Sequence, residues 1–284
     1  DAGLFYVKKL KKITNEKNLC LTGGVALNSC LNGLIRRENM YEKTFAPSGC
    51  NDAGHALGSP MYYESRFNKF KHERIDNDFL GYPYSLTDCK NAAEKVGVSY
   101  TELNSIQEAA EDMANELVNQ KIIAIFNEAP EFGPRALGHR SIVVDPRTAE
   151  MKDTLNARVK FREAYRPFAP FVLEEKATDY FEFGDSDFML FVAKVTEKGQ
   201  RDIPAVVHVD NTSRLQTVNE LNEPFYSTLK SFYKKTGTPV LLKTSFNVAG
   251  EPIVEAPEDA IRCFMGTSID ILYLNTLKIV KETI

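Results

Sequence analysis

The stretch that decides the fold is KIIAIF at Lys121–Phe126, followed shortly by FGPRALGHRSIVVDPR at Phe132–Arg147. The first segment is a short apolar run, which predicts a buried strand. The second contains Gly133, Pro134 and Gly138, and these residues predict a turn rather than a helix. We therefore expect a mixed α/β fold in which a buried strand delivers the turn that carries the chemistry.

Two arginines in this stretch, Arg135 and Arg140, are five residues apart. An ideal helix rotates by about 500° over this spacing and would point the two side chains in different directions. In a glycine-rich turn both guanidiniums can instead converge on one oxyanion or phosphate, because arginine offers bidentate, charge-assisted hydrogen bonds. The alternative is a surface turn with two solvated arginines, and this stretch alone does not separate the two interpretations.

The composition limits the class of protein. The chain has 284 residues, 43% of them hydrophobic, and a formal net charge of −4. A chain of this length can bury a sizeable core and has room for one large or two ordinary domains. The acidic charge argues against nucleic acid as the main partner, and no apolar run approaches the roughly 20 residues of a membrane helix. Five scattered cysteines without a CxxC pair favour a cytoplasmic location.

The N-terminal region contains a candidate anion site. We expect a helix over Asp1–Asn15, a strand over Leu19–Leu21, a turn at Gly23-Gly24 and a helix over Val25–Arg37. A strand, a double glycine and a helix start form an anion-binding geometry, because free amide groups point outward there. Close packing of the strand against the helix explains the glycines equally well.

Small residues surround Asp52 in the next segment, SGCNDAGHALG at Ser48–Gly58, which follows a predicted strand at Thr44–Pro47. Asp52 either caps a helix over Ala53–Tyr63, which is the ordinary role of an aspartate there, or serves as a metal ligand or phosphate-facing carboxylate. The polar stretch Glu64–Tyr84 predicts a linker to a larger second part.

Helices and strands alternate through that second part. Apolar periodicity predicts helices over Leu86–Val96, Ile106–Asn119, Pro224–Lys235 and Glu258–Met265, and strands over Phe188–Val195, Ala205–Val209, Gly237–Lys243 and Ile271–Leu274. Asp145-Pro146 predicts a further helix start. Along that helix Arg158, Arg162 and Arg166 would form a row of cations, which is usually a solvated face but which an anionic ligand would also stabilise.

Polar side chains gather at two places along the predicted strands. One alternation places a set of side chains on a single strand face: His208, Asp210, Thr212, Arg214 and Gln216. Elsewhere Thr244, Ser245 and Asn247 follow a strand end. Hydroxyls and an amide at the C-terminal end of a strand suit ligand binding in α/β folds, and a hydrogen-bonded turn is the alternative.

Six ordered motifs resemble the carbamoyltransferase family, which includes the nodulation-factor, cephalosporin and tobramycin O-carbamoyltransferases. They cover nearly the whole chain: LTGGVALNSCLNG (Leu21–Gly33), NDAGHALG (Asn51–Gly58), EFGPRALGHRSIVVDPR (Glu131–Arg147), VKFREAYRPFAP (Val159–Pro170), IPAVVHVDNTSRLQTV (Ile203–Val218) and LLKTSFNVAGEPIVEAPEDA (Leu241–Ala260). Any one motif is a weak signal, but so many in order do not arise by chance.

The resemblance implies a two-part enzyme. Residues 1–75 would be the C-terminal part of a Kae1-like domain, which has an actin-like ATPase fold, and residues 76–284 would be a YrdC-like domain with a twisted mixed sheet. The second domain would form a carbamoyl-adenylate from carbamoyl phosphate and ATP, and the first would pass the carbamoyl group to a hydroxyl of a small metabolite. Fixed guanidiniums would stabilise the charge that adenylation builds on the phosphates.

The resemblance also implies roles for individual residues. The catalytic residues would be Arg135, Arg140, Lys243 and Ser245. Contacts to carbamoyl phosphate or nucleotide would come from Gly23, Gly24, Asn28, His139, Lys160, Arg162, Arg166, His208, Asp210, Arg214 and Asn247. Asp52 would be one ligand of a partial metal site.

Two features depart from the family pattern. The family's metal site also uses a His-x-x-x-His pair, and no two of the four histidines have that spacing. We therefore expect a longer parent protein, whose N-terminal half is a partner of this chain and completes a site for iron or magnesium. The first residue, Asp1 rather than Met, agrees with this. Asn127–Pro130 stands where many relatives carry Gly-Arg, so one anion contact is lost or supplied elsewhere.

Two rival functions stay open. One is the bicarbonate-threonine adenylation of Sua5-like proteins, which yields a threonylcarbamoyl-adenylate. The GGVALN and NDAG segments favour carbamoyl transfer, because isolated YrdC-like proteins carry no Kae1-like segment. The other is a non-catalytic nucleotide- or RNA-binding module, and the acidic charge argues against RNA. The identity of the acceptor and the oligomeric state, including a homodimer, also stay open.

Overall fold

The computed structural model describes residues 2–68, 78–163 and 165–281. The first part of the chain contains α1 (Ala2–Thr14), β1 (Asn18–Cys20), a 3₁₀ turn (Gly24–Leu27), α2 (Ser29–Arg37), β2 (Lys43–Phe45) and α3 (His55–Phe67). β1 and β2 pair in parallel. Val7, Leu19 and Ile35 form a small core between α1, β1 and α2. The predicted first helix and the two strands are confirmed.

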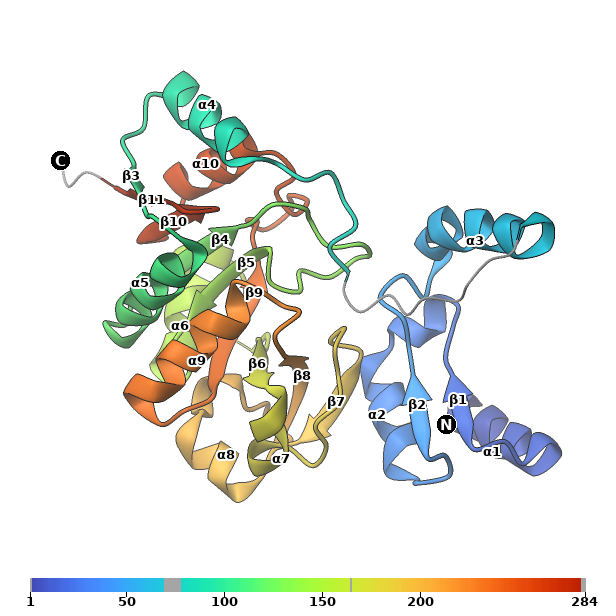
Figure 1. Cartoon of the computed structure of the whole chain (residues 1–284). Helices are drawn as coiled ribbons and strands as arrows, with labels where there is room; N and C mark the ends of the chain where they lie inside the picture. The colour runs from blue at the N-terminus through green and yellow to red at the C-terminus, as the bar shows by residue number, and fades with distance from the viewer. Residues whose placement is uncertain (1, 69–77, 164, 282–284) are drawn as a thin grey trace.

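The second part is built on one mixed sheet, in which nine strands lie within the described residues (Figure 1). Its order is β3-β11-β10-β4-β5-β9-β6-β8-β7. The strands are β3 (Thr101–Glu102), β4 (Ile123–Phe126), β5 (Arg140–Val144), β6 (Ala169–Leu173), β7 (Phe191–Lys194), β8 (Thr212–Val218), β9 (Val240–Ser245), β10 (Ile271–Leu274) and β11 (Leu277–Val280). β4 pairs in parallel with β10, and β6 with β8, whereas the other neighbours are antiparallel. This confirms the predicted mixed α/β fold.

Helices cover both faces of this sheet. They are α4 (Leu86–Val96), α5 (Ile106–Val118), α6 (Glu150–Leu155), α7 (Ala177–Tyr180), α8 (Glu197–Asp202), α9 (Phe225–Thr236) and α10 (Pro257–Met265). Ile123 and Ile125 of β4 pack in one core with residues of α5 and α9, whereas Ala124 and Phe126 join the opposite core with residues of α4 and α10. Because successive strand residues point to opposite faces, a strand covered on both sides must be apolar throughout.

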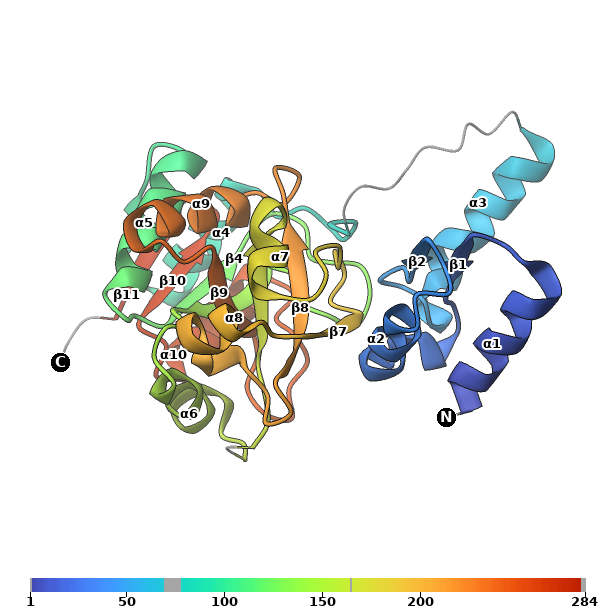
Figure 2. The ribbon, with the colours of Figure 1, turned by 90° about the horizontal axis from the view of Figure 1, so that it is seen from below.

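The first part packs against the edge strand β7 through α2 (Figures 1 and 2). Gly33 allows this close approach, because a Cβ at this position would lie 2.2 Å from the carbonyl oxygen of Val192. The preceding residue, Asn32, is buried, and its Nδ2 donates to the carbonyl oxygen of Leu190 at 2.9 Å. A glycine and an amide therefore join the two parts.

The glycine pair at Gly23-Gly24 is not a packing site, which corrects that alternative. A Cβ at either position would meet nothing within 4 Å, and Gly23 has a φ of +87°, which favours glycine. The helix predicted over Val25–Arg37 begins later as well. Asn28 interrupts it, and its Oδ1 accepts a hydrogen bond from the backbone N–H of Leu31 at 3.0 Å and so caps α2.

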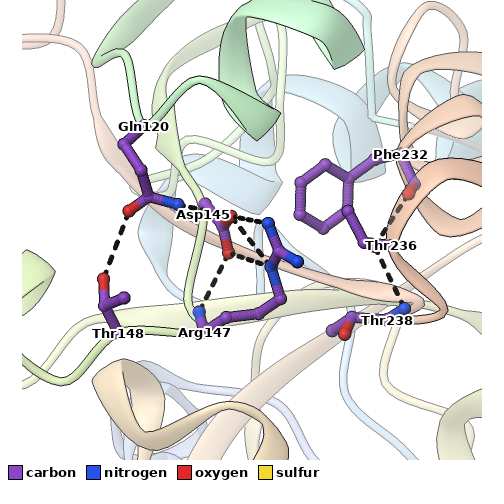
Figure 3. A network of polar contacts seen from close by, with 7 residues as sticks. All are labelled: Gln120, Asp145, Arg147, Thr148, Phe232, Thr236 and Thr238. Atoms are coloured by element: carbon purple, nitrogen blue, oxygen red, sulfur yellow. Dashed lines mark hydrogen bonds and ion pairs between the residues drawn. The ribbon is translucent and has the colours of Figure 1, made fainter.

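The predicted helix start at Asp145-Pro146 is wrong. α6 begins at Glu150, and the carboxylate of Asp145 is fully buried against Arg147 and Gln120 (Figure 3). It accepts hydrogen bonds from Arg147 Nε at 2.9 Å, from Arg147 Nη2 at 2.6 Å and from Gln120 Nε2 at 2.6 Å. Asp145 Oδ1 does accept from the backbone N–H of Arg147 at 2.9 Å, as a helix cap would, but residues 146–149 are not helical.

The predicted row of Arg158, Arg162 and Arg166 is also wrong, because the helix ends before Arg162. A π-helical turn over Asn156–Lys160 follows α6, and Phe161 then adopts a φ of +45°, which redirects the chain. Arg162 becomes partly buried, and the other two arginines are exposed.

Two further predictions need comment. Ala205–Val209 is not a strand, since a 3₁₀ turn at Pro204–Val206 and a tight turn precede β8, and the polar alternation holds only from Thr212 onward.

α3 extends to Phe67, and the rest of the predicted linker Glu64–Tyr84, with the predicted boundary between residues 75 and 76, lies mostly outside the described residues. In the described part of the chain, each helix lacks the length and apolarity needed to cross a membrane.

Candidate functional site

A cavity of about 380 Å³ beside β6, β8 and β9 is lined by four basic side chains. They come from four separate segments: Arg135 from the loop before β5, Arg162 from the segment after α6, Arg214 from β8 and Lys243 from β9. Sheet pairing brings β9 between β5 and β6, with β8 next to β6, so residues far apart in the sequence meet here. We call this site the basic cavity.

The cations of the basic cavity form no ion pair within the described residues, although the charge of Glu131 acts on Lys243. Within the described residues, Arg135 and Arg214 form no hydrogen bond or ion pair, and Nε of Arg135 is buried without a partner. Arg162 and Lys243 donate to neutral oxygens, Lys243 to the carbonyl oxygen of Ala136 at 2.5 Å. Gathering uncompensated cations is costly unless an anion binds among them. The arrangement therefore fits an anionic ligand.

Burial and mutual repulsion lower the pKa values of these groups. Burial lowers the pKa of Lys243 to about 7, with help from Arg214 and Arg135 and against the charge of Glu131. Burial also lowers the pKa of Arg214 to about 10, and the charges of Arg135 and Arg162 add to this effect. A bound anion would reverse these shifts, because an opposite charge favours the protonated forms.

Lys160 holds the loop that closes one side of the basic cavity. Its Nζ donates to the carbonyl oxygens of Ser245 at 2.9 Å and Asn247 at 2.8 Å, and to Oδ1 of Asn247 at 2.7 Å. Ser245 Oγ donates to the same Oδ1 at 2.7 Å. The amine is buried, and this burial, followed by the charge of Arg162, lowers its pKa to about 7. Ser245 and Asn247 line the basic cavity, and Lys160 positions them from behind.

Arg140 does not converge with Arg135, which corrects the first expectation. It is a residue of β5, and its fully buried guanidinium lies 3.5 Å from the ring centroid of Phe126. Nη1 donates to the carbonyl oxygen of Asn127 at 2.6 Å and Nη2 to that of Glu128 at 2.9 Å. Arg140 therefore anchors the segment Asn127–Pro130 rather than a ligand in the basic cavity.

His139, like Arg140, contacts the segment Asn127–Pro130 and does not line the basic cavity. Its Nδ1 contacts the carbonyl oxygen of Ala129 at 2.7 Å, and its Nε2 contacts that of Glu223 at 3.0 Å. The ring stacks on Phe79 with centroids 3.5 Å apart. Burial lowers the pKa of His139. These contacts hold the segment that precedes β5, away from the residues that line the basic cavity.

The remaining predicted site residues lie outside the basic cavity. Arg166 is exposed and pairs with Glu163 at 3.2 Å. His208 and Asp210 belong to the turn before β8, where Asp210 Oδ1 accepts from Thr212 Oγ1 at 2.6 Å. The predicted site residues of the first part are all exposed: Gly23, Gly24, Asn28 and Asp52.

Asp52 does not form a metal site with the residues that the structure describes. It is exposed in a 3₁₀ turn, Asp52–Gly54, and its predicted cap of the next helix is not formed. In the described ranges, no three His, Cys, Asp or Glu side chains gather where they would hold a metal ion. The residues that the structure describes therefore do not fit a metal.

Comparison with known proteins gives the family. The sequence matches the family described as Carbamoyltransferase C-terminus over residues 114–281 and the one described as Carbamoyltransferase N-terminus over residues 5–61. The chain belongs to the carbamoyltransferase family. All four cations of the basic cavity lie within the C-terminal match.

Two curated relatives are similar to this chain over nearly its whole length. Nodulation protein NolNO of Sinorhizobium fredii is 40% identical over 279 residues, which cover 96% of this chain and 41% of that protein. Nodulation protein NolO of Bradyrhizobium diazoefficiens is 38% identical over 278 residues, which cover 96% and 51%. The chain thus spans about half the length of the curated relatives it matches. Among solved structures, full-length HypF in its phosphate- and nucleotide-bound form aligns with a TM-score of 0.42 and 20% identity, over 59% of this chain and 21% of that one.

The basic cavity contains residues that sequence reasoning did not select. Glu251 lines the basic cavity, as do the apolar side chains of Phe168 and Met189. Phe168 also supports a cation, since the guanidinium of Arg162 lies 4.5 Å from its ring centroid. Phe168 follows Arg162 and Arg166 and lies between Pro167 and Pro170, which was a usable signal in the sequence. Met189 carries no local signal of a site.

Proposed function

We propose that this chain carries the adenylating half of an ATP-dependent O-carbamoyltransferase. The observation that supports it is the basic cavity, in which Arg135 and Arg214 have no protein partner within the described residues and face the same space as Arg162 and Lys243. Membership of the carbamoyltransferase family supplies the class of reaction. Cations that are fixed in advance stabilise charge on transferring phosphoryl groups without reorganising.

The proposed reaction has three balanced steps. Water cleaves carbamoyl phosphate to carbamate and phosphate. A carbamate oxygen then attacks the α-phosphorus of ATP, so that a carbamoyl-adenylate forms and pyrophosphate leaves. Finally, a hydroxyl of a small metabolite attacks the carbamoyl carbon, AMP leaves, and the hydroxyl proton passes to solvent. Binding the reactants side by side lowers the entropic part of the barrier.

The lining residues suggest which side chains bind the phosphates and which orient the carbamoyl group. Arg135 and Arg214 would bind phosphate oxygens, because their guanidiniums are free to form bidentate bonds. Lys243, which lines the same cavity, would add a charge. Ser245 and Asn247 would orient the carbamoyl group through their hydroxyl and amide, which Lys160 holds in place. Transfer to the acceptor would use the remainder of a longer parent protein, as expected from the half-length coverage of the relatives.

Pyrophosphate release from ATP by the purified chain tests this proposal. Release should depend on carbamoyl phosphate, and Arg214→Met should lower it by at least about 100-fold if that cation stabilises the transition state. Arg201→Met is the matched control, because Arg201 is exposed on α8 and lies outside the basic cavity.

Three outcomes would change the assignment. Release that depends on bicarbonate and threonine instead of carbamoyl phosphate would indicate threonylcarbamoyl-adenylate chemistry. Calorimetric binding of ATP without release would indicate a nucleotide-binding module. Absence of binding of both ATP and carbamoyl phosphate would reject the basic cavity as their site.

A further inference from the structure

The loop that carries Arg135 connects β4 to β5. These strands are antiparallel neighbours, and their pairing extends to Asn127, whose backbone N–H donates to the carbonyl oxygen of His139 at 3.0 Å. Residues 128–138 thus form the connection of a long hairpin, from which Arg135 lines the basic cavity. Because ordering each residue of a loop costs about 1–2 kcal/mol, this connection needs contacts of its own to hold Arg135 in place.

Glu131 bonds to the far end of the same loop. Its Oε1 accepts a hydrogen bond from the backbone N–H of Leu137 at 2.7 Å and another from that of Arg140 at 3.3 Å. One carboxylate oxygen therefore ties the first limb of the hairpin to the second, with Arg135 between the residues that it joins. Hydrogen bonds to an ionised acceptor are stronger than those between neutral groups, so this contact suits a loop that must keep one conformation.

Two side chains of the sheet hold the same part of the loop. Nζ of Lys243 on β9 donates to the carbonyl oxygen of Ala136 at 2.5 Å, and Nε2 of Gln216 on β8 donates to that of Leu137 at 2.8 Å. Both donors are buried. The backbone that follows the cavity arginine is thus fixed by two donors from the sheet and by one carboxylate of the loop itself.

The charge of Glu131 also acts on a cation of the basic cavity. Burial lowers the pKa of Lys243 to about 7, the charge of Glu131 opposes this effect, and the charges of Arg214 and Arg135 add to it. A nearby opposite charge favours the protonated form of an amine. Without the carboxylate, Lys243 would therefore lose its proton at a lower pH, and the basic cavity would lose one of its cations.

The same carboxylate acts on three groups that do not line the basic cavity. Burial lowers the pKa of Arg140 to about 10 and also lowers that of His139, and the charge of Glu131 opposes both effects. Burial raises the pKa of Asp78 to about 7, against a hydrogen bond from Ser48, and the charge of Glu131 adds to the rise. Since these groups lie outside the lining, we expect their titration to affect an anion in the cavity less than that of Lys243 does.

We infer that Glu131 is a positioning residue of the basic cavity, which holds the Arg135 loop through Oε1 and offsets the positive charge around Lys243. Its effect on carbamoyl-adenylate formation rests on the proposed function, whereas its effect on the binding of a simple anion does not. The two roles are separable, because a glutamine side chain keeps the Oε1 acceptor without the charge, and an alanine side chain keeps neither.

Calorimetric titration of the purified chain with sulfate, between about pH 5.5 and pH 9, tests the electrostatic role. In Glu131→Gln, the pH above which sulfate binding weakens should be about one pH unit lower than in the unaltered chain. Glu128→Gln is the matched control, because it removes the same charge from an exposed side chain of the same loop that does not line the basic cavity. The control should leave the pH profile unchanged.

The same titration at about pH 5.5, where Lys243 is charged, tests the hold on the loop. Glu131→Ala should bind sulfate at least about tenfold more weakly than the unaltered chain, whereas Glu131→Gln should stay within about twofold. If Glu131→Ala does not fold, Glu131→Asp replaces it, because its carboxylate is one methylene too short to reach both N–H groups. This variant should weaken binding by at least about threefold.

Three results would overturn the inference: an unchanged pH profile in Glu131→Gln, loss of sulfate binding by that variant at about pH 5.5, or full binding by the variant that lacks the acceptor. Release of pyrophosphate from ATP by the unaltered chain is measured in parallel. If release still depends on carbamoyl phosphate while one of these results is obtained, the proposed function survives and only the role of Glu131 fails.

Discussion

Lys160 Nζ lies 2.7 Å from Oδ1 and 2.8 Å from the carbonyl oxygen of Asn247. One buried ammonium thus fixes a loop that lines the basic cavity, although Lys160 itself lies behind that lining. The same amine also holds Ser245 through its carbonyl oxygen. Burial lowers the pKa of this amine. Lys160 is therefore best regarded as a positioning residue.

Lys160→Met should lower the free energy of unfolding by about 2 kcal/mol or more, because three oxygen atoms lose a charged donor inside the protein. It should also slow pyrophosphate release by raising KM more than it lowers kcat, since the binding loop is displaced. Urea unfolding and steady-state kinetics measure both. Lys234→Met, at an exposed site on α9, serves as the control. Normal stability together with normal KM in Lys160→Met would contradict the positioning role.

Removal of the guanidinium should change the free energy of unfolding strongly at Arg140 and weakly at Arg214. Arg140→Met should lower the free energy of unfolding by about 3–5 kcal/mol, because it removes a fully buried donor from the carbonyl oxygens of Asn127, which is buried, and Glu128. Arg214→Met should change it by less than about 1 kcal/mol, since it removes a repelling charge that has no partner in the described residues. Thermal unfolding of both variants without ligand checks this, and the reverse order of stabilities would show that the two roles have been exchanged.

The pKa of Lys243, about 7, predicts a pH-dependent affinity for anions. Below this pH the amine is charged and attracts an anion, and above it the attraction is lost. Sulfate, whose charge is constant over this range, should bind at least about threefold more weakly at pH 9 than at pH 6. For stability the sign is opposite: the folded state holds fewer protons than the unfolded state between pH 7 and the ordinary lysine pKa of 10.5, so this group's contribution improves as pH rises through that window.

The sulfate titration has its own control. Lys243→Met should bind sulfate weakly at both pH values, and the difference between them should disappear. If the variant keeps the same pH dependence as the unaltered chain, another group, such as Lys160 with its similarly lowered pKa, is responsible.

The contact between the two parts of the chain can be tested at a single glycine. Gly33→Ala should lower the free energy of unfolding by about 2 kcal/mol, because the new Cβ would lie 2.2 Å from the carbonyl oxygen of Val192 and force α2 away from β7. Gly58→Ala, inside α3 with nothing within 4 Å, should instead stabilise by about 0.5–1 kcal/mol. Chemical denaturation distinguishes them. Equal effects at the two glycines would mean that α2 has room to shift.

Elements with strong local signals were predicted well. α4 has the predicted bounds, Leu86–Val96, because Ser85 and Asp88 form a capping box at its start and Gly97 ends it in a left-handed conformation. β5 was missed as a strand, although Arg140–Val144 is buried at every position. A strand that begins with arginine and serine forms here because its backbone pairs with β4 on one side and with β9 on the other.

The sequence by itself determined the class of fold, the family, and the segments that carry the anion-binding residues, because periodicity and ordered motifs are local properties. The tertiary structure alone decided which cations share a cavity. Arg135, Arg162, Arg214 and Lys243 meet there, while Arg140 and Lys160 turn into the core. The physical reason is that the direction of a side chain depends on strand register and on a reversal such as that at Phe161, and neither can be read from spacing along the chain.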